Sequence, residues 1–368
     1  MMMNASGSGA SRTQNQGGDI SDIFTSLTGE AAADLPPCFS DLKKTIWNED
    51  MLQSWKEVLE ELKVAVEEVA SRTQDMILRV SYDNIKQGLS ESQVASIKKM
   101  GTVIVTGGVP QEEALGWKQS IRDYVAANKD CMRGFPADNI QVFELYNVPA
   151  LVAACTHPAL VNTQKALLSL WHASDPTSLN RIDMSTPMLY FNRLWIRLPG
   201  DAQFALGPHI DGGGLEHWED PGLRKVFAHI LCRTADKTWR DHDPFDMTPR
   251  LDAKQDLYNV SNQCSIFRPW QGWTALSSTG PGEGTLRVLP MLSLATVYLM
   301  LRPFFRPRHS SSASLKFGDW EPDTEGTAFP GSAMRKTQEL NPTTHPHLAL
   351  EQTMVSMPRV EPGNQVYC

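Results

Sequence analysis

The sequence predicts an α+β fold, with helices in the N-terminal half of the chain and a jelly roll in the C-terminal half. Two observations carry this prediction. Apolar residues recur every three or four positions early in the chain, which is typical of helices packed on a core. After about residue 185, short β-like runs are separated by Gly and Pro. Such short, punctuated strands favour a sandwich or jelly roll over a parallel sheet with crossover helices.

The helical part is expected at about residues 40–185. A long helix over 49–72 has an apolar stripe, and packing within its own domain is preferred to a coiled-coil partner. Ser90 and Gln93 form a plausible capping box at the start of a second helix. The run at 101–108 reads as a buried strand, and Pro110 then suits a new helix start. The stripe of the first helix consists of Leu52, Trp55, Leu59, Leu62, Val66 and Val69.

The jelly-roll part is expected at about residues 186–368, within a single domain spanning 21–368. Residues 1–20 are rich in Ser, Gly, Asn and Gln and are expected to form a disordered tail. Residues 306–347 are polar and are expected to be an insertion, either an active-site flap or a partly disordered loop. The predicted β-like runs are 190–201, 225–232, 265–277, 284–292 and 354–368.

The composition and charge of the chain limit the kinds of partner that we expect. The 368 residues are 41% hydrophobic and carry a formal net charge of −8, which argues against nucleic acid as the main partner. No run reaches the roughly 18 apolar residues that a membrane helix needs. Six dispersed cysteines and an N-terminus without an apolar signal segment predict a soluble, cytoplasmic protein with reduced thiols. The expected partner is a small-molecule substrate, with no nucleic acid and no membrane.

The segment GPHIDGGGLEHWEDP at 207–221 raises the possibility of a metal site. On an extended segment, residues two apart project to the same side, so His209 and Asp211 can share one ion. Iron(II) in oxygenases is held by two histidines and one carboxylate. Glycines at 212–214 would let a substrate approach the backbone closely. His217 and Glu219 have an equal formal claim to bind a metal, and a solvated turn without metal is a third interpretation.

Three blocks extend this observation beyond one motif. Residues 191–222, 267–290 and 358–367 resemble pieces of the iron(II)/2-oxoglutarate dioxygenases, and more closely those of the YbiU-like family. The resemblance runs from about residue 79 to residue 368. It implies a double-stranded β-helix of the cupin type, Fe(II) as the metal and 2-oxoglutarate as the cosubstrate.

In that family the H-x-D pair supplies two metal ligands, which correspond here to His209 and Asp211. Arg287, Arg197 and Arg193 are candidates to bind the cosubstrate or another anion, with surface or strand-edge ion pairs as the alternative.

The resemblance also implies a second histidine ligand on a strand that follows a proline-glycine turn. Residues 362–368 match that turn and the start of its strand, and the sequence given stops before a histidine appears. His345 and His347, upstream of this turn, are the alternative source of the third ligand.

Two functions are therefore expected from different classes. The first is an Fe(II)/2-oxoglutarate-dependent dioxygenase that hydroxylates a small molecule. The second is a catalytically inactive jelly-roll protein that binds a small molecule or a protein, which the missing histidine favours.

Overall fold

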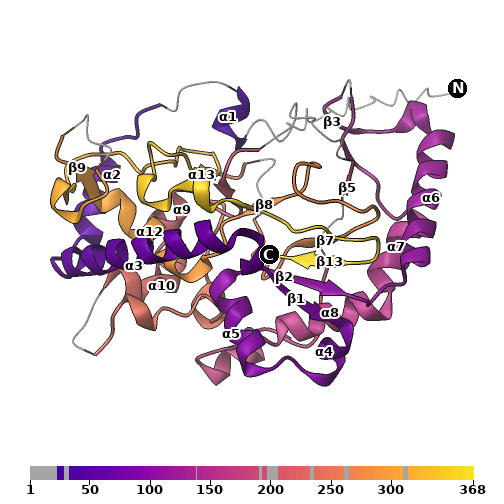
Figure 1. The fold of residues 1–368 in the computed structure, drawn as a ribbon. Helices are drawn as coiled ribbons and strands as arrows, with labels where there is room; N and C mark the ends of the chain where they lie inside the picture. The colour runs from indigo at the N-terminus through magenta and orange to yellow at the C-terminus, as the bar shows by residue number, and fades with distance from the viewer. Residues whose placement is uncertain are drawn as a thin grey trace, which may run out of the picture.

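The structure is a computed structural model. It describes residues 23–28, 33–137, 139–189, 193–196, 206–232, 236–260, 265–309 and 314–368. The predicted tail at 1–20 lies outside these residues. The longest helices come from the N-terminal half, and most of the short strands come from the C-terminal half (Figure 1).

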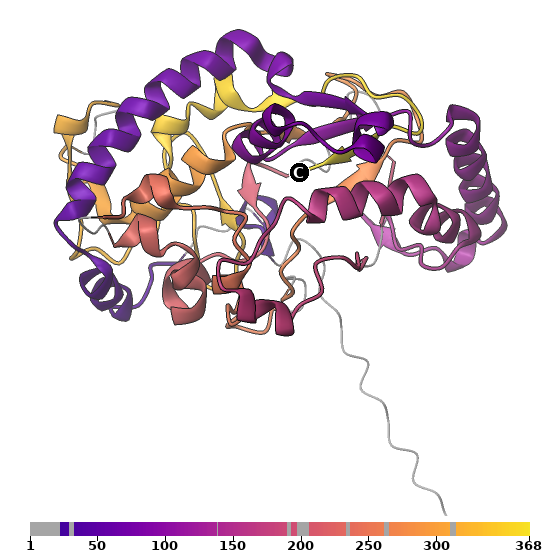
Figure 2. The same cartoon turned by 90° about the horizontal axis from the view of Figure 1, so that it is seen from below.

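The helices lie on both sides of the central strands. Figures 1 and 2 show α3 and α6 toward opposite ends of the molecule. The helix bounds are α1 Thr25–Thr28, α2 Cys38–Ile46, α3 Asp50–Arg72, α4 Tyr82–Gln87, α5 Glu91–Met100, α6 Gln111–Ala127, α7 Pro149–Thr156, α8 Pro158–Leu168, α9 Glu216–Glu219, α10 Pro221–Val226, α11 Ala228–Leu231, α12 Leu292–Leu301 and α13 Leu350–Thr353.

The strands are short. Their bounds are β1 Leu78–Ser81, β2 Val103–Thr106, β3 Gly134–Phe135, β4 Val142–Phe143, β5 Leu194–Trp195, β6 His209–Ile210, β7 Gly272–Thr274, β8 Arg287–Val288, β9 Phe305–Pro307, β10 Trp320–Pro322, β11 Gln338–Glu339, β12 Val355–Ser356 and β13 Gln365–Tyr367.

Local signals placed the N-terminal elements correctly. Helix α3 covers the predicted stripe, and its Trp55 is fully buried, stacked on Phe305 with ring centroids 4.5 Å apart. Ser90 and Gln93 form the reciprocal capping box of α5. The apolar run at 101–108 gives the buried strand β2, and α6 begins directly after Pro110.

The largest sheet joins the two halves of the chain. Its strand order is β1-β2-β13-β7, with β1 parallel to β2 and β13 antiparallel to both of its neighbours. Val366 of β13 lies opposite Ile104 of β2 and Trp273 of β7, and it is fully buried. The preceding turn has Gly363 at φ +89°, a left-handed conformation that suits glycine. The predicted turn and final strand are therefore confirmed.

The α+β class is confirmed, but the described residues do not show a jelly roll or double-stranded β-helix. Besides the four-stranded sheet, these residues form a three-stranded sheet, β3-β4-β5, and three strand pairs: β11 with β6, β12 with β8, and β10 with β9. The prediction of a strand over 225–232 is wrong, because the segment belongs to α10 and α11. A short apolar run fits a buried helix as well as a buried strand, so its length and composition did not decide between them.

The described part of the segment 306–347 contributes strands and side chains to the core. Strands β9 and β10 pair with each other, and Trp320 and Phe329 are buried. Strand β11 pairs with β6. Among the described residues, no helix has both the length and the apolar character needed to cross a bilayer.

Candidate metal centre

Strand β6 holds His209 between three neighbours. In the register with β11, His209 lies opposite Glu339. The ring of Phe24 packs edge-on against the imidazole, with centroids 4.9 Å apart. The Nδ1 atom of His209 lies 2.8 Å from the carbonyl oxygen of Gly207, which accepts a hydrogen bond from the ring in the Nδ1–H tautomer. This contact fixes the ring orientation and directs Nε2 away from the backbone.

The structure brings His209 and Asp211 together as the sequence predicted. The His209 Nε2 atom lies 3.4 Å from Asp211 Oδ1. In the neutral ring with a proton on Nδ1, Nε2 presents a lone pair, and a carboxylate oxygen also presents only lone pairs. A cation between the two atoms makes this arrangement favourable, either a proton on Nε2 or a metal ion. Ligand bonds of about 2.1 Å are long enough for both atoms to reach one ion.

Charge around His209 decides its protonation. Burial lowers the pKa of the imidazole, but the hydrogen bond and negative charge of Asp211 act in the opposite direction. The Gly207 carbonyl and the charge of Glu339 also favour the protonated ring, and the net result is a raised pKa. The pocket around Nε2 is therefore one that stabilises positive charge.

Asp211 is held from its other side by Gln271. The Gln271 Nε2 atom donates a hydrogen bond of 2.7 Å to Asp211 Oδ2. Burial raises the pKa of Asp211, but His209, this hydrogen bond and the charge of Arg268 together lower it to about 2. The carboxylate is therefore ionised near neutral pH, as a metal ligand must be. The backbone of Gln271 pairs with Cys368 through two hydrogen bonds, of 3.0 and 2.9 Å.

The loop at 212–214 needs its three glycines for its backbone conformation and close packing. Gly212 and Gly213 have φ values of +85° and +110°. A Cβ atom on Gly214 would lie 2.6 Å from the carbonyl oxygen of Lys336. One on Gly212 would lie 3.0 Å from the side-chain oxygen of Gln255. These glycines are therefore explained by backbone conformation and tight packing, without the close approach of a substrate.

The competing pair, His217 and Glu219, does not assemble. Both residues lie on α9, where residues two apart point in different directions. The His217 Nδ1 atom lies 2.8 Å from the Gly214 carbonyl oxygen, and burial lowers the pKa of the ring to about 4. Glu219 accepts a hydrogen bond from the Tyr258 hydroxyl. His217 is a packing residue here.

The predicted anion-binding arginines are engaged elsewhere or lie outside the described residues. The Nε and Nη2 atoms of Arg287 donate to the carbonyl oxygen of Met354, at 3.2 and 2.7 Å. The guanidinium of Arg193 lies over the ring of Tyr146, 5.0 Å from its centroid. Arg197 lies outside the described residues. The electrostatic effect of Arg268 on Asp211 was not anticipated from the sequence.

His345 and His347 do not supply a third ligand in this structure. Both are buried, and burial lowers the pKa of each to about 3. The His347 ring lies 4.8 Å from that of Trp320, and its Nδ1 atom lies 3.2 Å from the Tyr298 hydroxyl. Within the part of the chain that the structure describes, no group of three or more His, Cys, Asp or Glu side chains is placed to hold a metal.

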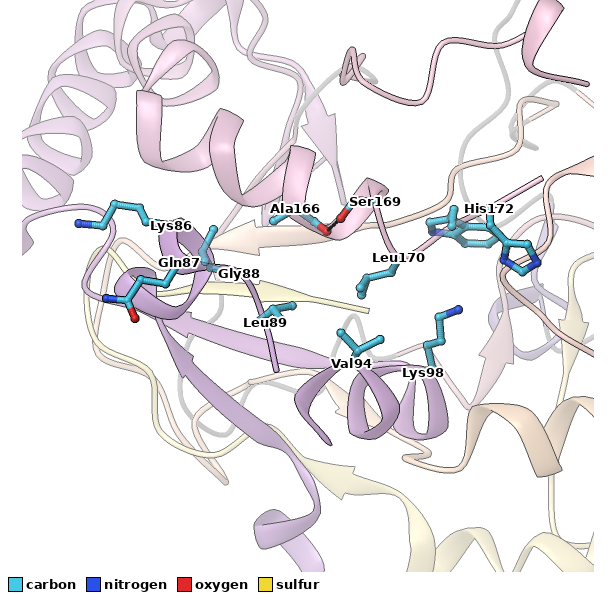
Figure 3. Close-up of a pocket in the computed structure, with 12 residues that line it drawn as sticks. Lys86, Gln87, Gly88, Leu89, Val94, Lys98, Ala166, Ser169, Leu170 and His172 are labelled. Atoms are coloured by element: carbon cyan, nitrogen blue, oxygen red, sulfur yellow. Dashed lines mark hydrogen bonds between the residues drawn. The ribbon is translucent and has the colours of Figure 1, made fainter. Parts of the chain in front are cut away.

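A separate hollow of about 860 Å³ lies between α4, α5 and the end of α8 (Figure 3). Its apolar lining includes Leu89, Val94 and Leu170. At one end, Lys98 and His172 lie 3.9 and 3.8 Å from the same carboxylate, that of Asp243. The lining includes neither member of the H-x-D pair, so this hollow is not the site of the predicted metal chemistry.

Comparison with known proteins identifies the family. The sequence pattern of the Gig2-like family matches residues 33–368. The chain belongs to the Gig2-like family. It is 31% identical over 302 residues to the uncharacterized protein YbiU of Escherichia coli (strain K12), covering 78% of this chain and 65% of YbiU. The chain thus spans about two thirds of the length of that relative.

Solved structures share the fold. GlcNAc Inducible Gene 2 from Candida albicans superposes with a TM-score of 0.81 at 28% identity, covering 92% of this chain and 72% of the other. A hypothetical protein from Escherichia coli gives a TM-score of 0.71 at 26% identity, covering 91% and 79%. The predicted resemblance to the YbiU-like family is confirmed.

Proposed function

We propose that this Gig2-like protein is a non-haem Fe(II)/2-oxoglutarate-dependent dioxygenase that hydroxylates a small molecule. The observation that carries the proposal is the facing pair of His209 Nε2 and Asp211 Oδ1, 3.4 Å apart. With Nδ1 directed at the Gly207 carbonyl, this pair needs a cation between its atoms. An imidazole and a carboxylate on one short extended segment are two of the three donors that non-haem iron sites use.

The surroundings suit a divalent metal. Asp211 is ionised near neutral pH, and the raised pKa of His209 shows that the site favours positive charge. When bound, Fe(II) would supply oxidising chemistry in which 2-oxoglutarate, O2 and a C–H bond give succinate, CO2 and an alcohol. The chain's own part is to hold the ligands and orient them: Gly207 fixes the imidazole, and Gln271 fixes the carboxylate.

The cosubstrate needs positive charge for its carboxylates. We assign this role to Arg268, whose positive charge lowers the pKa of Asp211. Arg287, Arg193 and Arg197 remain predicted anion-binding residues, although the bonds of Arg287 to the Met354 carbonyl favour a structural role for it. A test of this assignment compares the KM for 2-oxoglutarate of Arg268→Ala and Arg287→Ala under otherwise identical conditions.

A second function is favoured by a specific observation. Within the described residues, no third His, Cys, Asp or Glu joins His209 and Asp211 in a metal-binding group. A two-donor site binds a metal less firmly than a three-donor site, so a non-catalytic protein that binds a small molecule is the alternative.

Succinate formation from 2-oxoglutarate, with Fe(II) and O2, distinguishes the two functions. The dioxygenase proposal predicts Fe(II)-dependent succinate from the wild type and a loss of at least a hundredfold in His209→Ala, because one ligand is removed. His172→Ala is the matched control, since His172 also lies beside a carboxylate, 3.8 Å from Asp243, and should retain activity. Equal succinate from His209→Ala and wild type would contradict the ligand assignment. No succinate from the wild type would favour the binding protein.

A further inference from the structure

We propose that Gln271 is the positioning residue of the metal site, turning Asp211 so that one carboxylate oxygen faces His209. This inference rests on the proposed function. It assigns to Gln271 a role that neither the H-x-D motif nor the spacing of the sequence indicates.

The two carboxylate oxygens of Asp211 have different neighbours. Gln271 Nε2 donates to Oδ2 over 2.7 Å. Oδ1 is the atom that lies 3.4 Å from His209 Nε2. The terminal torsion of an aspartate side chain is broad and soft, so a carboxylate held at neither oxygen samples many orientations. A short bond to one oxygen restricts the direction in which the other oxygen points.

Gln271 is itself fixed by the central sheet. Its N–H donates to the Cys368 carbonyl oxygen over 3.0 Å, and the Cys368 N–H donates back over 2.9 Å. This pair continues the ladder in which Tyr367 of β13 lies opposite Gly272 of β7. Residues directly opposite in such a ladder direct their side chains to the same face of the sheet. The amide that holds Asp211 is therefore placed by a β-ladder and not by a loose loop.

The hydrogen bond from Gln271 to Asp211 is not needed to satisfy a buried amide group. Gln271 is an exposed residue, and water can satisfy an exposed amide without any protein partner. The short bond to Asp211 thus does more than pair a buried donor. Hydrogen bonds that orient metal ligands typically change metal affinity by about 10–100-fold when they are removed.

The test measures Co(II) binding to the 368-residue protein, using the metal alone as the probe. Gln271→Met keeps the length of the side chain and removes its donor. We expect the Co(II) dissociation constant to rise about 10–100-fold and the visible Co(II) absorption to change, because the carboxylate is no longer held in one orientation. The matched control is Gln119→Met, since Gln119 Nε2 donates to Asp123 Oδ1 over 2.8 Å on the exposed surface of α6. This variant should bind Co(II) as the wild type does.

His209→Ala, measured in parallel, separates this inference from the proposed function. Weak binding by His209→Ala together with wild-type affinity and spectrum in Gln271→Met would overturn the role of Gln271 while leaving the metal site in place. Wild-type binding by His209→Ala would place the Co(II) elsewhere, which contradicts both proposals. Thermal unfolding of each variant shows whether a loss of binding reflects a loss of the fold.

Discussion

At the scale of single residues, the sequence predicted that His209 and Asp211 lie together. It did not predict which residues hold them in place. His209 and Asp211 are two positions apart on an extended segment, so their proximity follows from strand geometry. Gln271 is 60 residues away from Asp211 along the chain, and only the folded sheet brings it to the carboxylate. Local sequence likewise left His217 as an equal candidate. Its placement on a helix, in a buried environment, decided against it.

The charge of Asp211 should control the protonation of His209 in the metal-free protein. We expect Asp211→Asn to lower the pKa of His209, because burial lowers this pKa and the raising effects of the carboxylate are lost. His209 with a raised pKa stabilises the fold below its unfolded pKa, and this contribution is lost as pH rises through the folded pKa. The variant should lose that pH dependence. The pKa is measured from the imidazole signals in an NMR titration.

Asp243→Asn is the control for this titration, because Asp243 lies near a different histidine, His172. It should leave the His209 signals unchanged. A His209 pKa that is the same in Asp211→Asn and the wild type would show that the carboxylate does not govern this ring.

At the scale of elements, strong local signals gave correct predictions and weak ones did not. The capping box of α5 and the buried strand β2 need only neighbouring residues for their recognition. The segment 306–347 is polar and rich in Ser, Pro and Thr, and for this reason the sequence predicts an insertion there. One of its contacts explains how it is held: Lys43 of α2 is fully buried, and its Nζ lies 3.0 Å from Asp323 Oδ2.

Breaking that ion pair should destabilise the protein strongly. Asp323→Asn leaves the buried Lys43 ammonium without its countercharge, and the loss of one partner of a buried pair costs about 3–5 kcal/mol. The free energy of unfolding is measured in urea.

The exposed pair between Lys44 and Glu325 provides the matched control for the urea experiment. Its atoms lie 2.8 Å apart, with 46% and 77% of the two side chains exposed. Glu325→Gln should have little effect on the free energy of unfolding, because solvent screens an exposed ion pair. If both variants lowered the free energy of unfolding equally, the burial of Lys43 would not make its ion pair more stabilising than an exposed one.

At the scale of the whole molecule, the topology was the least predictable feature. The sheet order β1-β2-β13-β7 joins residues near 80, 105, 273 and 366. No local pattern encodes such distant pairing. The same sheet places Gln271 beside Asp211, which directly follows β6, so the candidate site depends on contacts between segments that are far apart in the sequence. The sequence therefore indicated the pair of candidate ligands, whereas only the fold shows which side chain contacts Asp211.

The most direct test of the metal centre is anomalous X-ray scattering from crystals of the protein grown with Mn(II) under anaerobic conditions. Mn(II) stands in for Fe(II) and does not require the reaction to occur. If His209 and Asp211 bind the metal, an anomalous peak should lie about 2.0–2.3 Å from both His209 Nε2 and Asp211 Oδ1. The peak should be absent from crystals of His209→Ala. A wild-type structure in which Mn(II) lies elsewhere, with His209 and Asp211 bonded only to each other, would contradict the central claim.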